Sequence, residues 1–309
     1  MSNLSYTIPI LFIFFNRKEI ALESFEKIKK AKPQKLYLAS DGHREDKMGE
    51  AEKVLEIRNA ILQEIDWDCD IQTLFHETNL GCANAVLTAI NWLFEKEENG
   101  IILEDDCVVQ DSFFPFIEEL LERYKDDSRI GMIDGANYIQ YEIENSYCFS
   151  RYKSTNGWAT WRRAWKNMDM DMKWRDTKSD NSVLKNMGYL GKDINCWKYS
   201  LKAIDANFVS AWDWQWYFAL ASQNQLSIVP KVNLVSNIGF GKDATHTTEK
   251  LKPKYLADKE LSFPLLHPKY ILPDYSFDKA FNKGYNNFIY TLKRYMPFSI
   301  KKRLKKILR

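Results

Sequence analysis

The stretch Gly100-Ile101-Ile102-Leu103-Glu104-Asp105-Asp106 joins a short apolar run to three consecutive carboxylates. Its apolar half has the character of a β-strand that is covered on both faces. Neighbouring carboxylates repel each other unless a cation lies between them. A divalent metal that also contacts a diphosphate would supply this cation, because such ions favour oxygen ligands. The alternative is a solvated acidic turn at the end of a strand.

Strand-like and helix-like segments alternate on the N-terminal side of this stretch. The expected strands are Thr7–Phe14, Lys35–Ala39, Asp70–Phe75 and Gly100–Leu103, and the expected helices are Lys18–Ala31, Ala51–Ile65 and Asn79–Phe94. This alternation predicts an α/β fold with a mixed, mostly parallel sheet and helices on both faces. Two late strands are expected at Leu226–Val229 and Val232–Val235.

Polar residues follow two of these strands directly. Ser40-Asp41-Gly42 comes after the second strand, and Glu104-Asp105-Asp106 comes after the fourth. Ligands of such sheets bind at the carboxyl ends of the strands. The sequence therefore predicts a binding site at this edge of the sheet.

The segment Ile102–Leu121 (ILEDDCVVQDSFFPFIEELL) resembles the metal-binding segment of GT-A glycosyltransferases. It is similar in particular to the N-acetylglucosaminyltransferase I family and to related bacterial family 2 transferases. The resemblance covers roughly the first 250 residues and implies a Rossmann-like GT-A domain. It implies Asp106 as the metal ligand, Asp105 near the sugar or ribose, and Glu104 on the sugar side. The family's Asp-Phe-Phe stands here as Asp111-Ser112-Phe113-Phe114, with one residue inserted.

Other segments resemble the donor site of the same families. Phe15-Asn16-Arg17 is similar to the nucleotide-contacting start of the fold, and Asn79-Leu80-Gly81 is similar to an Asn-x-Gly turn that precedes the metal segment. The resemblance implies that Asp41 binds the uracil edge. Asn16-Arg17 could instead be a helix start, and Asp41-Gly42 a simple turn. The predicted donor-binding residues are Asn16, Arg17, Asp41, Asn79, Glu104 and Asp105.

Trp212-Asp213-Trp214 contains the best candidate for a catalytic base. An inverting sugar transfer needs one base to take the proton of the acceptor hydroxyl. An acid between tryptophans is expected to be partly desolvated, which raises its pKa. The related transferases carry their base in a similar Trp-Asp setting. The alternative is that Asp213 caps a helix over Trp214–Ala221.

Two further assignments also have structural alternatives. His246 follows a glycine-rich loop and could complete the metal shell or contact the diphosphate, although single histidines are often structural. Indole rings pack well on the C–H faces of sugars, but a tryptophan cluster is as often core. The residues predicted to line the sugar or acceptor pocket are Gly157, Trp158, Trp161 and Trp212.

Residues 279–309 carry ten basic and no acidic side chains, so a chain of net charge +2 has a body of about −8. This division argues against nucleic acid as a partner. The apolar residues Phe288, Ile289, Leu292, Ile300, Leu304, Ile307 and Leu308 complete a basic amphipathic helical tail, which is expected to lie on an anionic membrane surface. It could instead pack on the body or on a second subunit. Five scattered cysteines and the absence of a signal-peptide pattern favour the cytoplasm, at the inner face of the cytoplasmic membrane.

These patterns predict a transferase domain over 1–278, with a nucleotide-binding half at 1–135 and an acceptor and catalytic half at 136–250, followed by the tail at 279–309. The expected activity is an inverting, Mn²⁺- or Mg²⁺-dependent transfer of a hexose or N-acetylhexosamine. The UDP-sugar would donate its sugar to a glycan or a lipid-linked oligosaccharide in surface polysaccharide synthesis.

A nucleotidyltransferase is the alternative enzyme, although Phe14–Lys18 lacks the glycine-rich loop of that class. A non-catalytic carbohydrate- or membrane-binding protein on this fold is the third reading. The sugar, the acceptor and the oligomeric state stay open.

Overall fold

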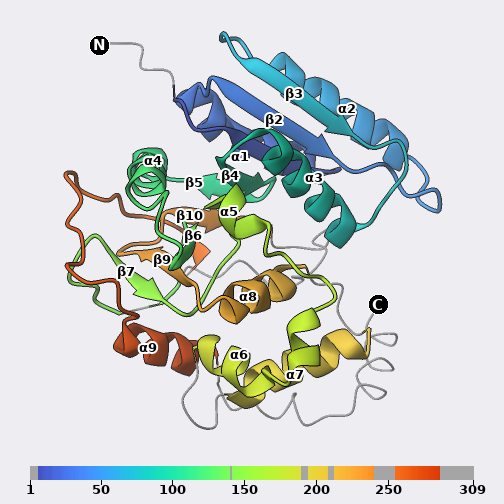
Figure 1. Cartoon of the computed structure of the whole chain (residues 1–309). Helices are drawn as coiled ribbons and strands as arrows, with labels where there is room; N and C mark the ends of the chain where they lie inside the picture. Colours follow the sequence, from blue (N-terminus) through green and yellow to red (C-terminus); the bar gives the residue numbers. More distant parts are fainter. Residues whose placement is uncertain (1–5, 140, 189–193, 208–211, 240–254, 286–309) are drawn as a thin grey trace.

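An eight-stranded sheet with the order β3-β2-β1-β4-β8-β6-β9-β7 forms the centre of the molecule (Figure 1). The computed structural model describes residues 6–139, 141–188, 194–207, 212–239 and 255–285. The strands β1 to β4 are mutually parallel, β8 runs antiparallel to both β4 and β6, and β9 is parallel to β6. The strands are β1 (Ile10–Phe14), β2 (Lys35–Ser40), β3 (Asp70–Phe75), β4 (Asn99–Glu104), β6 (Ile130–Asp134), β7 (Tyr147–Ser150), β8 (Trp158–Trp161) and β9 (Leu226–Pro230).

Helices cover both faces of this sheet, which confirms the predicted α/β class. Strand β1 shows why its sequence is apolar throughout: Phe12 and Phe14 pack on one face with α1, α2 and α4, whereas Leu11 packs on the other face with α3 and α8. The helices are α1 (Lys18–Ala31), α2 (Glu50–Gln63), α3 (Cys82–Lys96), α4 (Phe113–Arg123), α5 (Arg162–Trp165), the 3₁₀ helix η1 (Lys173–Thr177), α6 (Asp180–Asn186), α7 (Ile194–Asp205), α8 (Asp213–Ser222) and α9 (Tyr275–Tyr285).

The second of the two expected late strands, Val232–Val235, begins three residues later than predicted. The strand β10 (Val235–Asn237) pairs antiparallel with β5 (Cys107–Val109), outside the main sheet. Asn233 prevents an earlier start, because its side-chain oxygen accepts a hydrogen bond from the N–H of Asn137 (3.0 Å) and its amide donates to the carbonyl of Val235 (2.9 Å). Such local side-chain bonds compete with a strand ladder.

The main sheet contains strands from both of the predicted halves of the chain. Strand β8, from the predicted acceptor half, lies between β4 and β6 of the predicted nucleotide-binding half. Helix α9 runs across the boundary expected at 278. In the part of the chain that the structure describes, no helix combines the length and the apolar composition that a membrane crossing needs. Residues 286–309 lie outside the described residues, so the membrane contact of the tail stays a prediction.

Candidate functional site

A cavity of about 310 Å³ opens at the carboxyl ends of β1, β2 and β4, beside the start of α3. We call it the first cavity. All six residues that were predicted to bind the donor line it, although they come from four separate segments: Asn16, Arg17, Asp41, Asn79, Glu104 and Asp105. The strand order explains this meeting, because β1 is hydrogen-bonded to both β2 and β4. Parallel neighbours bring the residues that follow them to one edge of the sheet.

Arg17 is the cation that contacts the acidic triplet. Its guanidinium forms an ion pair with Asp105 and lies 3.2 Å from Oδ2 of Asp106. Burial lowers the pKa of Arg17, but Asp105 and Asp106 outweigh that effect and raise it. Burial raises the pKa of Asp105 to about 6, although Arg17 opposes this rise. The triplet is therefore only partly neutralised by the protein itself.

Glu104 shows the remaining excess of negative charge. Burial raises the pKa of its carboxyl to about 8, and Asp106, Asp105 and Asp213 add to the rise. Asp213 belongs to α8 and lies more than a hundred residues further along the chain. Its charge therefore acts on the acidic triplet from a distant part of the chain.

Asp106 is held at the junction of β4 and the small β5–β10 sheet. Its carbonyl accepts a hydrogen bond from the N–H of Ile238 (2.9 Å), and its carboxylate lies against Gly239, where any Cβ would collide with it. The carboxylate is 18% exposed and is free of main-chain hydrogen bonds among those described. It can therefore serve as a metal ligand. His246, the other predicted ligand, lies outside the described residues.

The described side chains alone do not enclose a metal. Within the described ranges, no group of three or more His, Cys, Asp or Glu side chains is arranged to hold an ion. Mg²⁺ and similar ions need few protein carboxylates when substrate phosphates and water complete the shell. The charge excess around Glu104 and the accessible carboxylate of Asp106 fit such a cation.

Asp41 organises the turn that forms the opposite wall of the first cavity. Its two oxygens accept hydrogen bonds from the N–H groups of Gly42 (2.9 Å), Leu80 (2.8 Å) and Gly81 (3.1 Å). They also accept one from the side-chain amide of Asn79 (2.9 Å). Both oxygens are therefore engaged, and this geometry favours a positioning role for Asp41. Its contact with the uracil edge stays a prediction.

The first cavity also contains three side chains that were not predicted from the sequence, namely Arg44, His76 and Cys82. Arg44 forms an ion pair with the buried Glu50, which also accepts a hydrogen bond from Asn16 (2.9 Å). The Nε2 atom of His76 is buried and finds no hydrogen-bond partner in the part of the chain that the structure describes. These residues lie in a loop, after a strand and at a helix start, and no local pattern marks them.

Asp213 lies at the first residue of α8, so the expected helix is present but begins one residue earlier than predicted. The residue in the cap position is Trp212. Burial raises the pKa of Asp213 to about 6, although the N–H groups of Trp214 and of Asp213 itself oppose the rise. Asp213 also lines a second cavity of about 390 Å³, which lies between the ends of β6 and β9 and the helices α7, α8 and α9. Its carboxyl group also adds to the rise in the pKa of Glu104, which lines the first cavity.

The predicted sugar-contacting tryptophans lie in the core in this structure. Trp158 is 0% and Trp161 is 2% exposed, on opposite faces of the central strand β8. Trp212 stacks on Trp158 with 6.1 Å between the ring centres, and Gly157 is buried beside Val235. None of the four lines either cavity. The difference from the prediction arises for Trp158 and Trp161 because β8 is a central strand of a sheet with both faces covered. Side chains on either face of this strand are therefore buried.

Comparisons with known proteins find distant structural likeness only. No protein-family model matches the chain, and no curated protein matches it. Mouse xyloside xylosyltransferase 1 shares 11% identity, with a TM-score of 0.36 over 59% of this chain and 77% of that one. A cytidylyltransferase from Leptospira borgpetersenii shares 11% identity, with a TM-score of 0.33 over 54% of this chain and 64% of that one. The 4-diphosphocytidyl-2C-methyl-D-erythritol synthase from Anaerococcus prevotii shares 9% identity, with a TM-score of 0.31 over 52% of this chain and 74% of that one.

Proposed function

We propose that this protein is a metal-dependent glycosyltransferase that moves a sugar, with inversion, from a UDP-sugar to a glycan or lipid-linked acceptor. The observation that carries the proposal is the first cavity itself. It brings together the three strand ends, Arg17 and two members of the acidic triplet, Glu104 and Asp105, while Arg17 also contacts the third member, Asp106. Asp213, from a distant part of the chain, adds to the rise in the pKa of Glu104. A nucleotide-sugar needs a sheet edge that binds its nucleotide, and carboxylates that can hold a metal ion near its diphosphate.

Asp213 is suited to act as the base. Its pKa of about 6 leaves it ionised at neutral pH while making it a stronger base than an ordinary aspartate. Its place in the wall of the second cavity would let it take the proton from a hydroxyl of an acceptor bound there. The oxygen left behind would then attack the sugar carbon on the side opposite the nucleotide, which inverts that centre.

Asp106 would hold the metal ion, and Arg17 would keep Asp105 in place beside it. The bound ion would supply positive charge for the leaving diphosphate. The main-chain hydrogen bonds that Asp41 accepts would hold the turn at its side of the first cavity in place before the donor enters. Preorganisation of this kind lowers the cost of binding.

The proposal is tested by calorimetric titration of UDP with and without Mn²⁺, on the full chain and on Asp106→Asn. We expect metal-dependent binding that weakens at least about tenfold in the variant. Asp111→Asn is the matched control, because this aspartate lies five residues further along the chain, after β5, and pairs with Lys27 and Lys30 at the surface. Binding of UDP that ignores both Mn²⁺ and Asp106 would sink the proposal and favour a non-catalytic binding protein.

A product assay separates the two enzyme readings. A glycosyltransferase releases UDP from UDP-sugars, by slow hydrolysis even without acceptor, whereas a nucleotidyltransferase releases pyrophosphate from UTP and a hexose 1-phosphate. We expect UDP release from at least one of UDP-glucose, UDP-galactose and their N-acetylamino forms. Release of pyrophosphate alone would assign the site to nucleotidyl transfer instead.

A further inference from the structure

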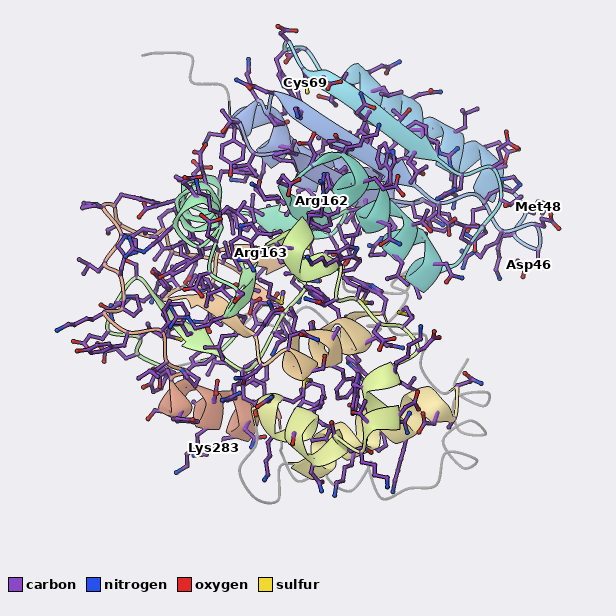
Figure 2. All side chains as sticks on the ribbon, viewed as in Figure 1. Asp46, Met48, Cys69, Arg162, Arg163 and Lys283 are labelled. Carbon is purple, nitrogen blue, oxygen red and sulfur yellow. The ribbon has the colours of Figure 1, made fainter. Side chains whose placement is uncertain are left out.

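The second cavity has a wall that the proposed donor chemistry does not use. It is formed by the end of β6, the segment after β7, and the helices α7, α8 and α9. Its volume of about 390 Å³ lies within the range of small-molecule sites. Helix α9 closes one side through Phe277, and Figure 2 shows Lys283 of the same helix pointing outward, away from the body.

Asp134, the last residue of β6, carries an unused buried oxygen in this cavity. The residue is 2% exposed, and the N–H of Ser154 and the hydroxyl of Ser227 interact with its carboxyl. Its Oδ1 atom is buried and has no hydrogen-bond partner among the described residues. An unsatisfied buried polar atom costs about 1–3 kcal/mol, so its presence at a cavity wall indicates a ligand that completes it.

Lys153 lies beside Asp134 and is 6% exposed. Its ammonium donates one described hydrogen bond, to the carbonyl of Arg151. An ammonium group has three N–H donors, so the described bonds account for one of them. Burial lowers the pKa of Lys153 to about 8, with Asp134 and Asp278 opposing that change. The cavity therefore presents a strong donor next to an acceptor oxygen.

Asn137 is another polar residue of this wall, and it differs from this pair. The amide of Asn137 is already engaged, since it donates to the carbonyl of Pro230 (2.8 Å) and accepts from the N–H of Ile139 (3.0 Å). The apolar part of the wall includes the rings of Trp214 and Phe277. A donor, an acceptor and aromatic faces around one space match the adjacent hydroxyls and the C–H face of a sugar ring.

The charge around the cavity selects against an anionic ligand. Asp213 lines the space, and its pKa of about 6 leaves it ionised at neutral pH. Burial raises the pKa of Asp134 well above its usual range, which disfavours its ionised form beside the ligand. A phosphate or carboxylate would meet the Asp213 charge at close range and be repelled, and would further disfavour ionisation of Asp134, whereas a neutral hydroxyl would not. Lys153 then serves as a hydrogen-bond donor to an uncharged oxygen.

We propose that the second cavity binds one neutral sugar residue, with Asp134 and Lys153 hydrogen-bonded to adjacent hydroxyls. That this sugar is the acceptor rests on the proposed function, because Asp213 would then face one of its hydroxyls. Sugar binding itself does not depend on the donor site and can be measured alone.

The test is saturation-transfer difference NMR on the full chain with methyl glycosides of glucose, galactose, mannose and N-acetylglucosamine, each with and without UDP and Mn²⁺. We expect at least one neutral glycoside to bind. Asp134→Asn and Lys153→Met should each weaken that binding about tenfold, the factor set by about 1.4 kcal/mol. UDP affinity should stay within about twofold in both variants, because neither residue lines the first cavity.

Asp278→Asn is the matched control. Asp278 is also a buried carboxyl with an unpartnered oxygen, but it is held by the hydroxyl of Ser150 (2.6 Å) and does not line the cavity. We expect glycoside binding to be unchanged in it.

The proposal is overturned if no neutral glycoside binds the wild-type chain, or if Asp134→Asn and Lys153→Met both bind like wild type. Tighter binding of methyl glucuronide or glucose 6-phosphate than of the neutral glycosides would overturn the proposal that the ligand is neutral. Glycoside binding without UDP binding would support this site while rejecting the donor site.

Discussion

Asp213 is a buried carboxyl in the wall of the second cavity, and its burial is expected to lower stability while favouring activity. In the folded chain its pKa is about 6, above the value of about 4 for an aspartate in an unfolded chain. The folded state therefore holds the proton more tightly. Stability falls as the pH rises from about 4 to about 6 and stays reduced above that range.

From this we predict that Asp213→Asn stabilises the ligand-free protein at pH 8 by up to about 3 kcal/mol, since two pKa units correspond to that energy. The gain should shrink as the pH falls to 5. The same variant should lose at least about a hundredfold in sugar transfer if Asp213 is the base. Urea unfolding at both pH values, together with UDP-release assays, measures the two effects. An equal stability change at both pH values would contradict the raised pKa.

At the same scale, the acidic triplet was predicted from the sequence, whereas Asp134 was not. Ile130-Gly131-Met132-Ile133-Asp134 repeats the pattern of an apolar strand followed by an acid, and this signal was available. The tryptophans could not be assigned, because core and pocket walls use the same residue type. Trp158 and Trp161 become core through the insertion of β8 into the sheet, which is a non-local event.

At the scale of elements, the turn after β2 depends on a close approach of two loops. A Cβ on Gly42 would collide with the main-chain atoms of Thr78, next to the parallel bridge between His43 and Thr78. The approach aligns Asp41 with the main-chain N–H groups at the start of α3. The loop then runs outward to Asp46 and Met48, which Figure 2 shows at its outer tip.

We predict that Gly42→Ala separates the two loops, lowers stability by about 1–3 kcal/mol, and weakens UDP binding about tenfold or more. Gly49→Asn is the control in the same loop. Gly49 has a φ of 77° and open space around its Cα, and asparagine tolerates that conformation. Thermal melts and UDP titrations give both quantities. Unchanged UDP affinity in Gly42→Ala would show that this turn is not part of the nucleotide wall.

Local elements of the N-terminal part were predictable because their periodicity is complete within each segment. Helix α1 and strand β3 have the expected bounds. The pairing of β10 with β5 was not predictable, because it joins segments that lie over a hundred residues apart and depends on the side chain of Asn233.

At the scale of the whole molecule, the order of the sheet couples the two predicted halves. Strand β6 is hydrogen-bonded to β8 and β9, which both come later in the chain. A fragment of residues 1–135 would leave both edges of β6 and one edge of β4 without partners. Exposed apolar strand edges promote aggregation.

We therefore predict that the fragment 1–135 lacks a cooperative unfolding transition and aggregates, whereas a chain of residues 1–285 melts cooperatively. Circular dichroism during heating, with light scattering as the second signal, distinguishes the two. A cooperative melt of the short fragment would show that its strands form an independent domain.

The place of β8 also bears on the order in which the protein can be made. A nascent chain reaches β6 well before β8 and β9 have left the ribosome, so β6 must wait for both neighbours. During that interval its apolar residues have no strand to pair with. We expect a chaperone that shields apolar segments to bind this stretch of the growing chain, and the finished sheet to close only after residue 230 has emerged.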